Sequence, residues 1–224
     1  MMFDNFTLLY INLLIYHEIF VINAYNAKKE EIKDKVVIDV GANFGAFSFL
    51  ASGMGAKKII AIEPDYKNYV CLLENITKYK TTNIIPIYKA LASENDKMVF
   101  MEGDGVLAKT TDIPNGTKAV KTYTLQYVYD LLEVEKEHAI LKIDTEGAEY
   151  DILLSANPEL LSKFEYIYAE LHLTENHSPD EIISLLKSLS FNLVSTYIFY
   201  NNFEDGHKEE NPNKVYKFEK QKQS

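Results

Sequence analysis

A short glycine-containing loop between an apolar strand and a helix most constrains the fold of this 224-residue chain. Residues 36–40 (VVIDV) form an apolar, β-branched run that predicts a buried strand, and residues 46–54 predict the helix after it. The connection, residues 39–45 (DVGANFG), holds Gly41 and Gly45, which permit positive φ and close backbone approach to a ligand. A strand that turns through such a loop into a helix is typical of open α/β sheets, which bind ligands beyond the carboxyl ends of their strands.

Apolar runs alternate with amphipathic segments along most of the chain, which predicts βαβ units and a parallel sheet. Core strands are expected at residues 36–40, 58–63, 84–89, 138–144 and 166–172, with later strands at 191–200 and 214–219. Helices are expected at 46–54, 66–79 (capped by Asp65), 125–133, from 148 onward, and from the capping box at 178–181. Pro86 lacks a backbone donor, so its strand is expected at an edge of the sheet.

Two regions depart from this alternation. Residues 97–101 and 118–123 predict short strands joined by a polar stretch, which we interpret as an inserted hairpin or flap spanning about 97–123. The polar and acidic residues 201–213 are expected to form a mobile loop. We therefore divide the chain into an N-terminal helical segment (1–34) and one α/β domain (35–224).

The N-terminal segment is strongly apolar from residue 8 to 22. It is short for a membrane span, which needs roughly 20 apolar residues, and Asn12, His17 and Glu18 interrupt it. It has no basic region and no small-residue cleavage site, so it does not resemble a signal peptide. We expect a helix that packs on the core or on a second subunit, which is consistent with a homodimer; peripheral membrane association is the alternative.

Charge and cysteine content limit the choice of partner and compartment. A formal net charge of −10 argues against broad binding to nucleic acid, which needs a basic face. All 23 basic residues are lysine, so bidentate guanidinium contacts are not available. A single cysteine, Cys71, excludes an internal disulfide and a cysteine-built zinc site. We expect Cys71 to be a small core residue. The low cysteine content also fits a protein of the reducing cytoplasm.

The loop at 39–45 and an acid on the next strand narrow the choice of cofactor. Glu63 lies 24 residues after Asp39, where an acid accepts hydrogen bonds from ribose hydroxyls. A dinucleotide loop would carry glycine at position 43 to meet the pyrophosphate, but Asn43 stands there. Asp39 suits a cationic cofactor without phosphate. These residues favour S-adenosylmethionine; an NAD-dependent oxidoreductase, a non-catalytic binding module and a turn without ligand are the alternatives.

A second group of ionisable residues follows the fourth core strand. Lys142, Asp144, Glu146, Glu149 and Asp151 fall within ten residues at its carboxyl edge. Charges there cost free energy unless they are hydrogen-bonded or used. Structural explanations stay open, because Glu146 and Glu149 favour the positive end of the next helix and Asp144 can cap that helix.

Two residues are candidate general bases for a hydroxyl acceptor. Asp144 and His172 lie at the carboxyl ends of neighbouring predicted strands, and Glu170 shares a strand face with His172. His172 has the reference pKa nearer neutrality, about 6.5, although a hydrogen-bonding role at the strand end explains it nearly as well. Asp144, Glu146 and His172 are expected to lie close together, and such a group can bind a divalent cation. No spacing in the sequence requires a metal ion, and none is predicted.

Together these motifs resemble the FkbM family of class I methyltransferases over about residues 35–200. The resemblance rests on DVGANFG (39–45), EP (63–64), ALAS (90–93), KIDTEGAE (142–149) and ELH (170–172). It implies a three-layer, Rossmann-like α/β sandwich whose seven-stranded, mostly parallel sheet ends in an antiparallel strand. It also implies S-adenosylmethionine-dependent O-methylation of a hydroxyl on a sugar, glycan or small metabolite; an RNA-directed methyltransferase is the alternative within the class.

The resemblance and the residue arguments give two sets of expected site residues. The cofactor-binding set is Asp39, Gly41, Asn43, Gly45, Glu63, Ala90, Leu91 and Asp144. The catalytic set is Asp144, His172, Lys142 and Glu146. By the resemblance, the glycine loop lines the methionine end of the cofactor, Glu63 holds the ribose, Ala90 and Leu91 lie near the adenine, and Asp144 lies near the methyl group.

Overall fold

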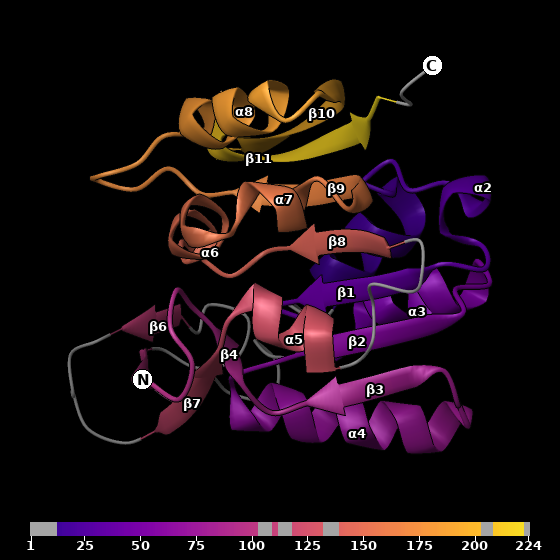
Figure 1. The fold of residues 1–224 in the computed structure, drawn as a ribbon. Coiled ribbons are helices and arrows are strands. Elements are labelled where there is room, and N and C mark those ends of the chain that lie inside the picture. The colour runs from indigo at the N-terminus through magenta and orange to yellow at the C-terminus, as the bar shows by residue number, and fades with distance from the viewer. Residues whose placement is uncertain (1–12, 103–108, 112–117, 132–138, 203–207, 222–224) are drawn as a thin grey trace.

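Seven strands form the central sheet, in the order β10-β11-β9-β8-β1-β2-β3 (Figure 1). The computed structural model describes residues 13–102, 109–111, 118–131, 139–202 and 208–221. The strands are β1 (Val36–Val40), β2 (Lys58–Ile62), β3 (Ile84–Ile87), β8 (Ala139–Ile143), β9 (Phe164–Leu171), β10 (Phe191–Asn202) and β11 (Lys208–Lys220). Neighbours pair in parallel except β11, which is antiparallel to β9 and β10. The predicted fold class is confirmed, and Pro86 lies in the edge strand β3 as expected.

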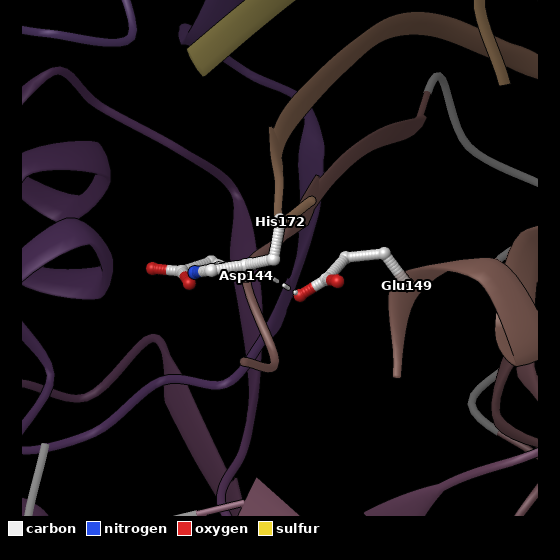
Figure 2. Close-up of side chains that lie close together, drawn as sticks. All are labelled: Asp144, Glu149 and His172. Carbon is white, nitrogen blue, oxygen red and sulfur yellow. Dashed lines mark hydrogen bonds and ion pairs between the residues drawn. The ribbon is translucent and has the colours of Figure 1, made fainter. Parts of the chain in front are cut away.

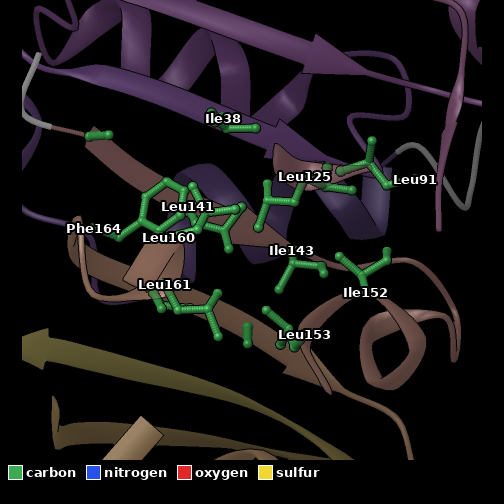
Figure 3. Close-up of a cluster of buried hydrophobic side chains, with 14 of the residues drawn as sticks. Ile38, Leu91, Leu125, Leu141, Ile143, Ile152, Leu153, Leu160, Leu161 and Phe164 are labelled. Carbon is green, nitrogen blue, oxygen red and sulfur yellow. The ribbon is translucent and has the colours of Figure 1, made fainter. Parts of the chain in front are cut away.

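Helices cover both faces of this sheet and complete the three layers. They are η1 (His17–Ile22), α2 (Lys29–Ile32), α3 (Ala46–Gly53), α4 (Tyr66–Tyr79), α5 (Leu125–Leu131), α6 (Glu149–Ser155), α7 (Pro158–Leu161) and α8 (Pro179–Ser188). Helices α5 to α8 pack in one apolar cluster, part of which Figure 3 shows. Helices η1 to α4 pack in a second cluster on the opposite face.

Strand β1 shows why the sequence forms a sheet buried on both sides. Val36, Ile38 and Val40 point into the first cluster, whereas Val37 joins the second. Side chains alternate between the faces of a strand, so a continuous apolar run is required where both faces are covered. The same alternation turns Asp39 toward the face of α3, where it is fully buried.

A smaller sheet, in the order β4-β7-β5-β6, lies on the side toward which the arrowheads of β3 and β8 point in Figure 1. Its strands are β4 (Ala90–Leu91), β5 (Met98–Glu102), β6 (Lys109–Thr111) and β7 (Ala119–Tyr123). Strands β5 and β7 pair antiparallel, as a hairpin requires, but β6 lies in the stretch expected to be only a polar connection.

The prediction of a mobile loop at 201–213 is wrong for the residues that the structure describes. Tyr200 pairs with Glu210 and Asn202 with Lys208, so strands β10 and β11 run through most of that segment. A β-ladder joins backbone groups and tolerates polar side chains on an exposed hairpin. A register shift after Ile198 accommodates Pro212, which has no backbone donor.

Cys71 also departs from its predicted environment, because its side chain is exposed. Helix α4 is amphipathic, and Leu72 is its one buried residue. The neighbouring position therefore points away from the sheet. The prediction of a core cysteine is wrong.

The N-terminal segment packs on the domain through apolar side chains on one of its faces. Ile19 is buried in the second apolar cluster and Ile15 packs against it. Leu13, Tyr16 and Val21 on the same segment are more than half exposed, at 56%, 54% and 62%. Within the described residues, no helix combines the length and apolar character needed to span a membrane.

Candidate active site

A cavity of about 370 Å³ lies beside the carboxyl ends of β1, β2 and β8. The expected site residues that line it are Gly41, Asn43, Glu63, Ala90, Leu91, Lys142, Asp144 and Glu146. Asp39, Gly45 and His172 were also expected at the site but do not line the cavity. Both sequence motifs thus meet in one cavity at the sheet edge where open α/β folds bind ligands.

The loop between β1 and α3 depends on its two glycines. Gly41 has φ +74°, and a Cβ atom there would lie 1.7 Å from the carbonyl oxygen of Asp144. Gly45 has φ +98° and forms the N-cap of α3, where a Cβ atom would lie 2.6 Å from Leu72. Gly41 therefore lets the loop touch the backbone after β8, and Gly45 lets α3 start against α4.

Glu63 joins the loop between β1 and α3 to the end of β2. Its carboxylate accepts hydrogen bonds from the backbone N–H of Asn43 and of Asp65, both at 2.7 Å. Burial raises the pKa of Glu63 to about 7, although the two N–H donors oppose the shift. Asp65 in turn caps α4 by accepting from Lys67 N and Asn68 N, as predicted. The Glu63 side chain lines the cavity, and its carboxylate can also accept a hydrogen bond from a hydroxyl group of a bound ligand.

Lys142 is the buried cation behind the cavity. Its Nζ lies 3.2 Å from Asp39 Oδ1 and 3.6 Å from Asp144 Oδ2, and it donates to Gly41 O at 3.0 Å. Burial opposes its charge, but Asp39 and Asp144 outweigh that effect and hold the pKa of Lys142 above its usual value. Asp39 is also held by the Ser48 hydroxyl at 2.6 Å. Lys142 and Asp39 therefore tie the glycine loop to the end of β8, and Lys142 also lines the cavity.

Two residues of the N-terminal segment reach the site, and sequence reasoning missed both. The Tyr25 hydroxyl donates to Asp144 Oδ2 at 3.2 Å, and its ring is 1% exposed. Glu18 lines the cavity on the side of η1. Neither residue belongs to a motif, so only the tertiary fold reveals the contact.

His172 follows β9 and lies next to the fully buried Glu149, behind the part of the cavity that Asp144 and Glu146 line. The Glu149 carboxylate accepts from Thr145 N at 2.6 Å and Gly147 N at 3.0 Å, and lies 3.2 Å from His172 Nδ1. Figure 2 shows the His172 ring between the carboxylates of Asp144 and Glu149. Burial favours a neutral ring, but the Glu149 hydrogen bond and charge prevail and raise the pKa of His172 to about 10. The sequence argument for His172 as a general base used the reference pKa of about 6.5, and the carboxylates around the ring move its pKa away from that value.

Further carboxylates surround the imidazole. Glu146 Oε2 lies 3.4 Å and Glu170 Oε1 3.8 Å from His172 Nε2. Burial is the main cause that raises the pKa of Glu146, and of Glu18, to about 7, and it raises that of Glu170 well above its usual value. Glu149 is the exception: burial opposes its charge, but His172 outweighs this and lowers its pKa. The carboxyl groups of Glu18, Glu146 and Glu170 around this end of the cavity therefore hold their protons more tightly than free acids do.

The seven-stranded sheet with its antiparallel β11, and a cavity at the switch between β1 and β8, define a Rossmann-like methyltransferase fold. The family model described as "Methyltransferase FkbM domain" matches residues 39–193. The chain belongs to the FkbM methyltransferase family. The resemblance found in the sequence motifs is thereby confirmed, and family membership supports S-adenosylmethionine as the cofactor.

Solved structures agree on the fold. The FkbM methyltransferase from Methylobacillus flagellatus KT aligns with a TM-score of 0.52 and 14% identity, covering 91% of this chain and 47% of that one. An rRNA methylase from Streptococcus thermophilus aligns with a TM-score of 0.51 and 14% identity, covering 87% and 92%. No curated protein matches the sequence. At such identities the likeness concerns the fold alone.

Proposed function

We propose that this methyltransferase transfers the methyl group of S-adenosylmethionine to a hydroxyl oxygen of a sugar, glycan or small metabolite. The observation that carries the proposal is the continuity of one cavity from the glycine loop to the carboxylate of Asp144. The loop end offers a site for the cofactor, and the acid end offers a proton acceptor. The two ends are joined by the backbone contact at Gly41.

The cofactor end of the cavity suits a nucleoside that carries cations. Glu63 is placed to accept hydrogen bonds from ribose hydroxyls, and Ala90 and Leu91 provide apolar surface for a base. Asn43 stands where a pyrophosphate would need glycine, and the nearby carboxylates would repel phosphate. These features favour S-adenosylmethionine over NAD.

Asp144 is our candidate for the residue that receives the acceptor's proton. In the transfer, the acceptor oxygen forms a bond to the methyl carbon as the carbon–sulfur bond breaks, and the hydroxyl proton passes to the Asp144 carboxylate. Tyr25 and Lys142 contact its Oδ2, which fixes the orientation of the group. Bound S-adenosylmethionine supplies an activated methyl group, so alignment by the protein is the main gain, with a base adding about 10²–10⁴-fold.

An RNA acceptor is the second candidate, because one structural neighbour is an rRNA methylase. The net charge of −10 and the carboxylates of Glu18, Glu146 and Glu170 weigh against it, since a phosphate backbone favours a basic surface. Release of S-adenosylhomocysteine with oligosaccharides, small polyols and RNA as acceptors distinguishes the two.

Thermal melts with S-adenosylhomocysteine, with NAD and without ligand test the cofactor. A ligand at about 100 times its dissociation constant stabilises the fold by roughly 2.7 kcal/mol. For a chain of this size we expect a shift on the order of 5–10 °C with S-adenosylhomocysteine. No shift with it, or a larger shift with NAD, would contradict the proposal.

Replacing Asp144 with asparagine tests the acceptor chemistry separately. We expect turnover to fall by about 10²–10⁴-fold while the S-adenosylhomocysteine shift is kept, because the amide takes no proton. Asp130→Asn is the matched control, since Asp130 lies on α5 and bonds only Gln126 in the described structure. Equal turnover in both variants would remove Asp144 from the mechanism.

A further inference from the structure

An exposed apolar surface lies on the N-terminal segment, next to the cavity. Residues 13–22 are helical, and six of their large apolar side chains are 38–62% exposed: Leu13, Leu14, Tyr16, Phe20, Val21 and Ile22. Residues three or four positions apart are neighbours on a helix, as the stacked rings of Tyr16 and Phe20 show, with 5.0 Å between their centroids. These six residues therefore form one surface, which we call the apolar face, and apolar patches of this kind mark binding sites.

Leu14 connects the apolar face to the cavity. It lines the cavity, and at 51% exposure it is the most exposed of the described residues that do so. Ile15 and Ile19 line the cavity from the same segment but are turned inward, where both pack in the second apolar cluster. The cavity therefore opens beside Leu14, and its apolar wall continues outward along the apolar face.

Glu18 forms the inner, polar end of the same wall. It lies one helical turn after Leu14 and also lines the cavity. Burial, and then the charge of Asp144, raise the pKa of Glu18 to about 7, which places its carboxyl group near Asp144. Along this wall the surface therefore changes from a polar group near Asp144 to apolar side chains at the mouth of the cavity.

The volume of the cavity limits how much of an acceptor it can enclose. Cavities that bury one drug-sized ligand have about 300–1,000 Å³, and this cavity has about 370 Å³. Under the proposed function the cofactor occupies the end at the glycine loop, so only the reacting group of the acceptor fits beside Asp144. The rest of the acceptor has to pass through the mouth, where Leu14 begins the apolar face.

We propose that the acceptor is amphipathic: its hydroxyl-bearing end reaches Asp144, and an apolar portion, such as an alkyl or acyl chain, lies along the apolar face. This inference rests on the proposed function and narrows its substrate class to sugars, glycans or metabolites that carry an apolar group. Covering apolar surface on both the acceptor and residues such as Leu14 and Tyr16 adds binding free energy without any further polar contact.

Two other occupants of the apolar face fit the structure less well. Helices that lie on a membrane surface usually carry lysine or arginine on their polar side, but residues 13–27 contain neither, and the net charge of the chain is −10. A second copy of the chain seated on the apolar face would cover Leu14 and close the mouth of the cavity.

Binding of alkyl glucosides to the full-length protein tests the inference without requiring turnover. Methyl, hexyl and octyl β-D-glucoside, each below its critical micelle concentration, are titrated by calorimetry into protein saturated with S-adenosylhomocysteine. We expect the affinity to rise about two- to fourfold for each added methylene group, the upper value being that of a fully buried one. Binding of the octyl compound that is absent, or no tighter than that of the methyl compound, would overturn the inference.

Leu14→Ser assigns the binding to the apolar face. We expect it to weaken binding of octyl glucoside by about five- to tenfold and to leave the methyl compound unaffected, because the alkyl chain loses an apolar neighbour. Leu131→Ser is the matched control, since Leu131 on α5 is 52% exposed but does not line the cavity. Equal loss of binding in both variants, or no loss in Leu14→Ser, would contradict the assignment.

Val21→Ser distinguishes the other occupants, because Val21 is 62% exposed and does not line the cavity. A dimer in gel filtration that this variant converts to a monomer would overturn the inference in favour of a subunit interface. Co-sedimentation of the parent with equimolar phosphatidylcholine and phosphatidylglycerol vesicles, lost in the variant, would overturn it in favour of a membrane surface.

The thermal melt with S-adenosylhomocysteine separates this inference from the proposed function. A normal shift without any dependence of glucoside binding on chain length would overturn the amphipathic acceptor alone. Binding that depends on chain length without a shift would contradict the cofactor and leave a site for amphipathic ligands standing.

Discussion

At the scale of single residues, the site consists of a positioned carboxylate and the groups that hold it. Asp144 lies between the Tyr25 hydroxyl and the Lys142 ammonium, which contact the same oxygen. Lys142 also contacts Asp39 and the Gly41 carbonyl oxygen, so the glycine loop and Asp144 share one buried cation. A change at Lys142 would therefore alter the surroundings of both the glycine loop and Asp144.

Tyr25 is the residue of this group that lies outside the matched family region. We expect Tyr25→Phe to lower turnover on the order of tenfold, about 1.4 kcal/mol, because Asp144 loses one of its two orienting contacts. The shift with S-adenosylhomocysteine and the KM of the acceptor should change little, which separates positioning from binding. Tyr16→Phe is the control, since Tyr16 is exposed on the same segment. Equal turnover of the two variants would rule out a positioning role for Tyr25.

At the scale of secondary-structure elements, the N-terminal segment is anchored to the sheet by a buried ion pair. Lys217 Nζ on β11 lies 2.6 Å from Glu31 Oε1 and donates to Asn26 O at 2.9 Å. The Tyr168 hydroxyl on β9 donates to the other Glu31 oxygen at 2.8 Å. These contacts hold the N-terminal segment, which includes Glu18 and Tyr25, against the domain.

Breaking this anchor should destabilise the protein strongly. Glu31→Ala leaves the Lys217 charge buried and without its acid, which costs about 3–5 kcal/mol in comparable cases. Glu210→Gln is the matched control, because Glu210 pairs with Lys214 on the same strand at 3.0 Å but is half exposed. It should cost less than about 1 kcal/mol. Denaturant unfolding of the parent, Glu31→Ala and Glu210→Gln proteins measures these costs. Similar free energies of unfolding for the two variants would contradict the role of Glu31 as an anchor.

At the scale of the whole molecule, the parts predicted from the sequence are those with a local cause. The alternating faces of β1, the Asp65 cap and the capping box at Ser178 each follow from neighbours in the chain, and each is found in the structure. The cofactor loop was predicted for the same reason. These features need only local periodicity and hydrogen bonding, which a single sequence displays.

The features that sequence reasoning missed depend on distant parts of the chain. The Tyr25 contact spans 119 residues and the Glu149 contact with His172 spans 23. The pKa of His172 could not be anticipated, because it depends on carboxylates that only the fold assembles. The length of the β10–β11 pairing was underestimated because the polar residues in this segment show no apolar alternation, although their backbones pair.

The acidic cavity should make the stability of the whole protein depend on pH. The pKa of Glu63 is raised by burial from 4.5 to about 7 in the folded protein. Such an acid binds its proton more tightly when folded, so its contribution is full below pH 4.5 and is lost as the pH rises through 7. For Glu63 the loss amounts to about 3 kcal/mol at most. Glu18, Glu146 and Glu170 shift in the same direction.

Glu63→Gln isolates this contribution. Its free energy of unfolding should fall less between pH 5 and pH 8 than that of the parent, because the amide does not titrate. Glu159→Gln, at an exposed acid on α7, should keep the parental pH dependence. Parallel pH curves for Glu63→Gln and the parent would show that the carboxyl titrates alike in folded and unfolded chains.

The contact between Gly41 and the carbonyl oxygen of Asp144 has a consequence for engineering. Since a side chain at position 41 would collide with the carbonyl oxygen of Asp144, position 41 cannot be substituted without moving the backbone that carries Asp144. The wall formed by Leu14 and Glu18 has no such constraint, because it comes from a separate helical segment. Libraries aimed at a new acceptor should therefore vary that wall and leave the glycine unchanged.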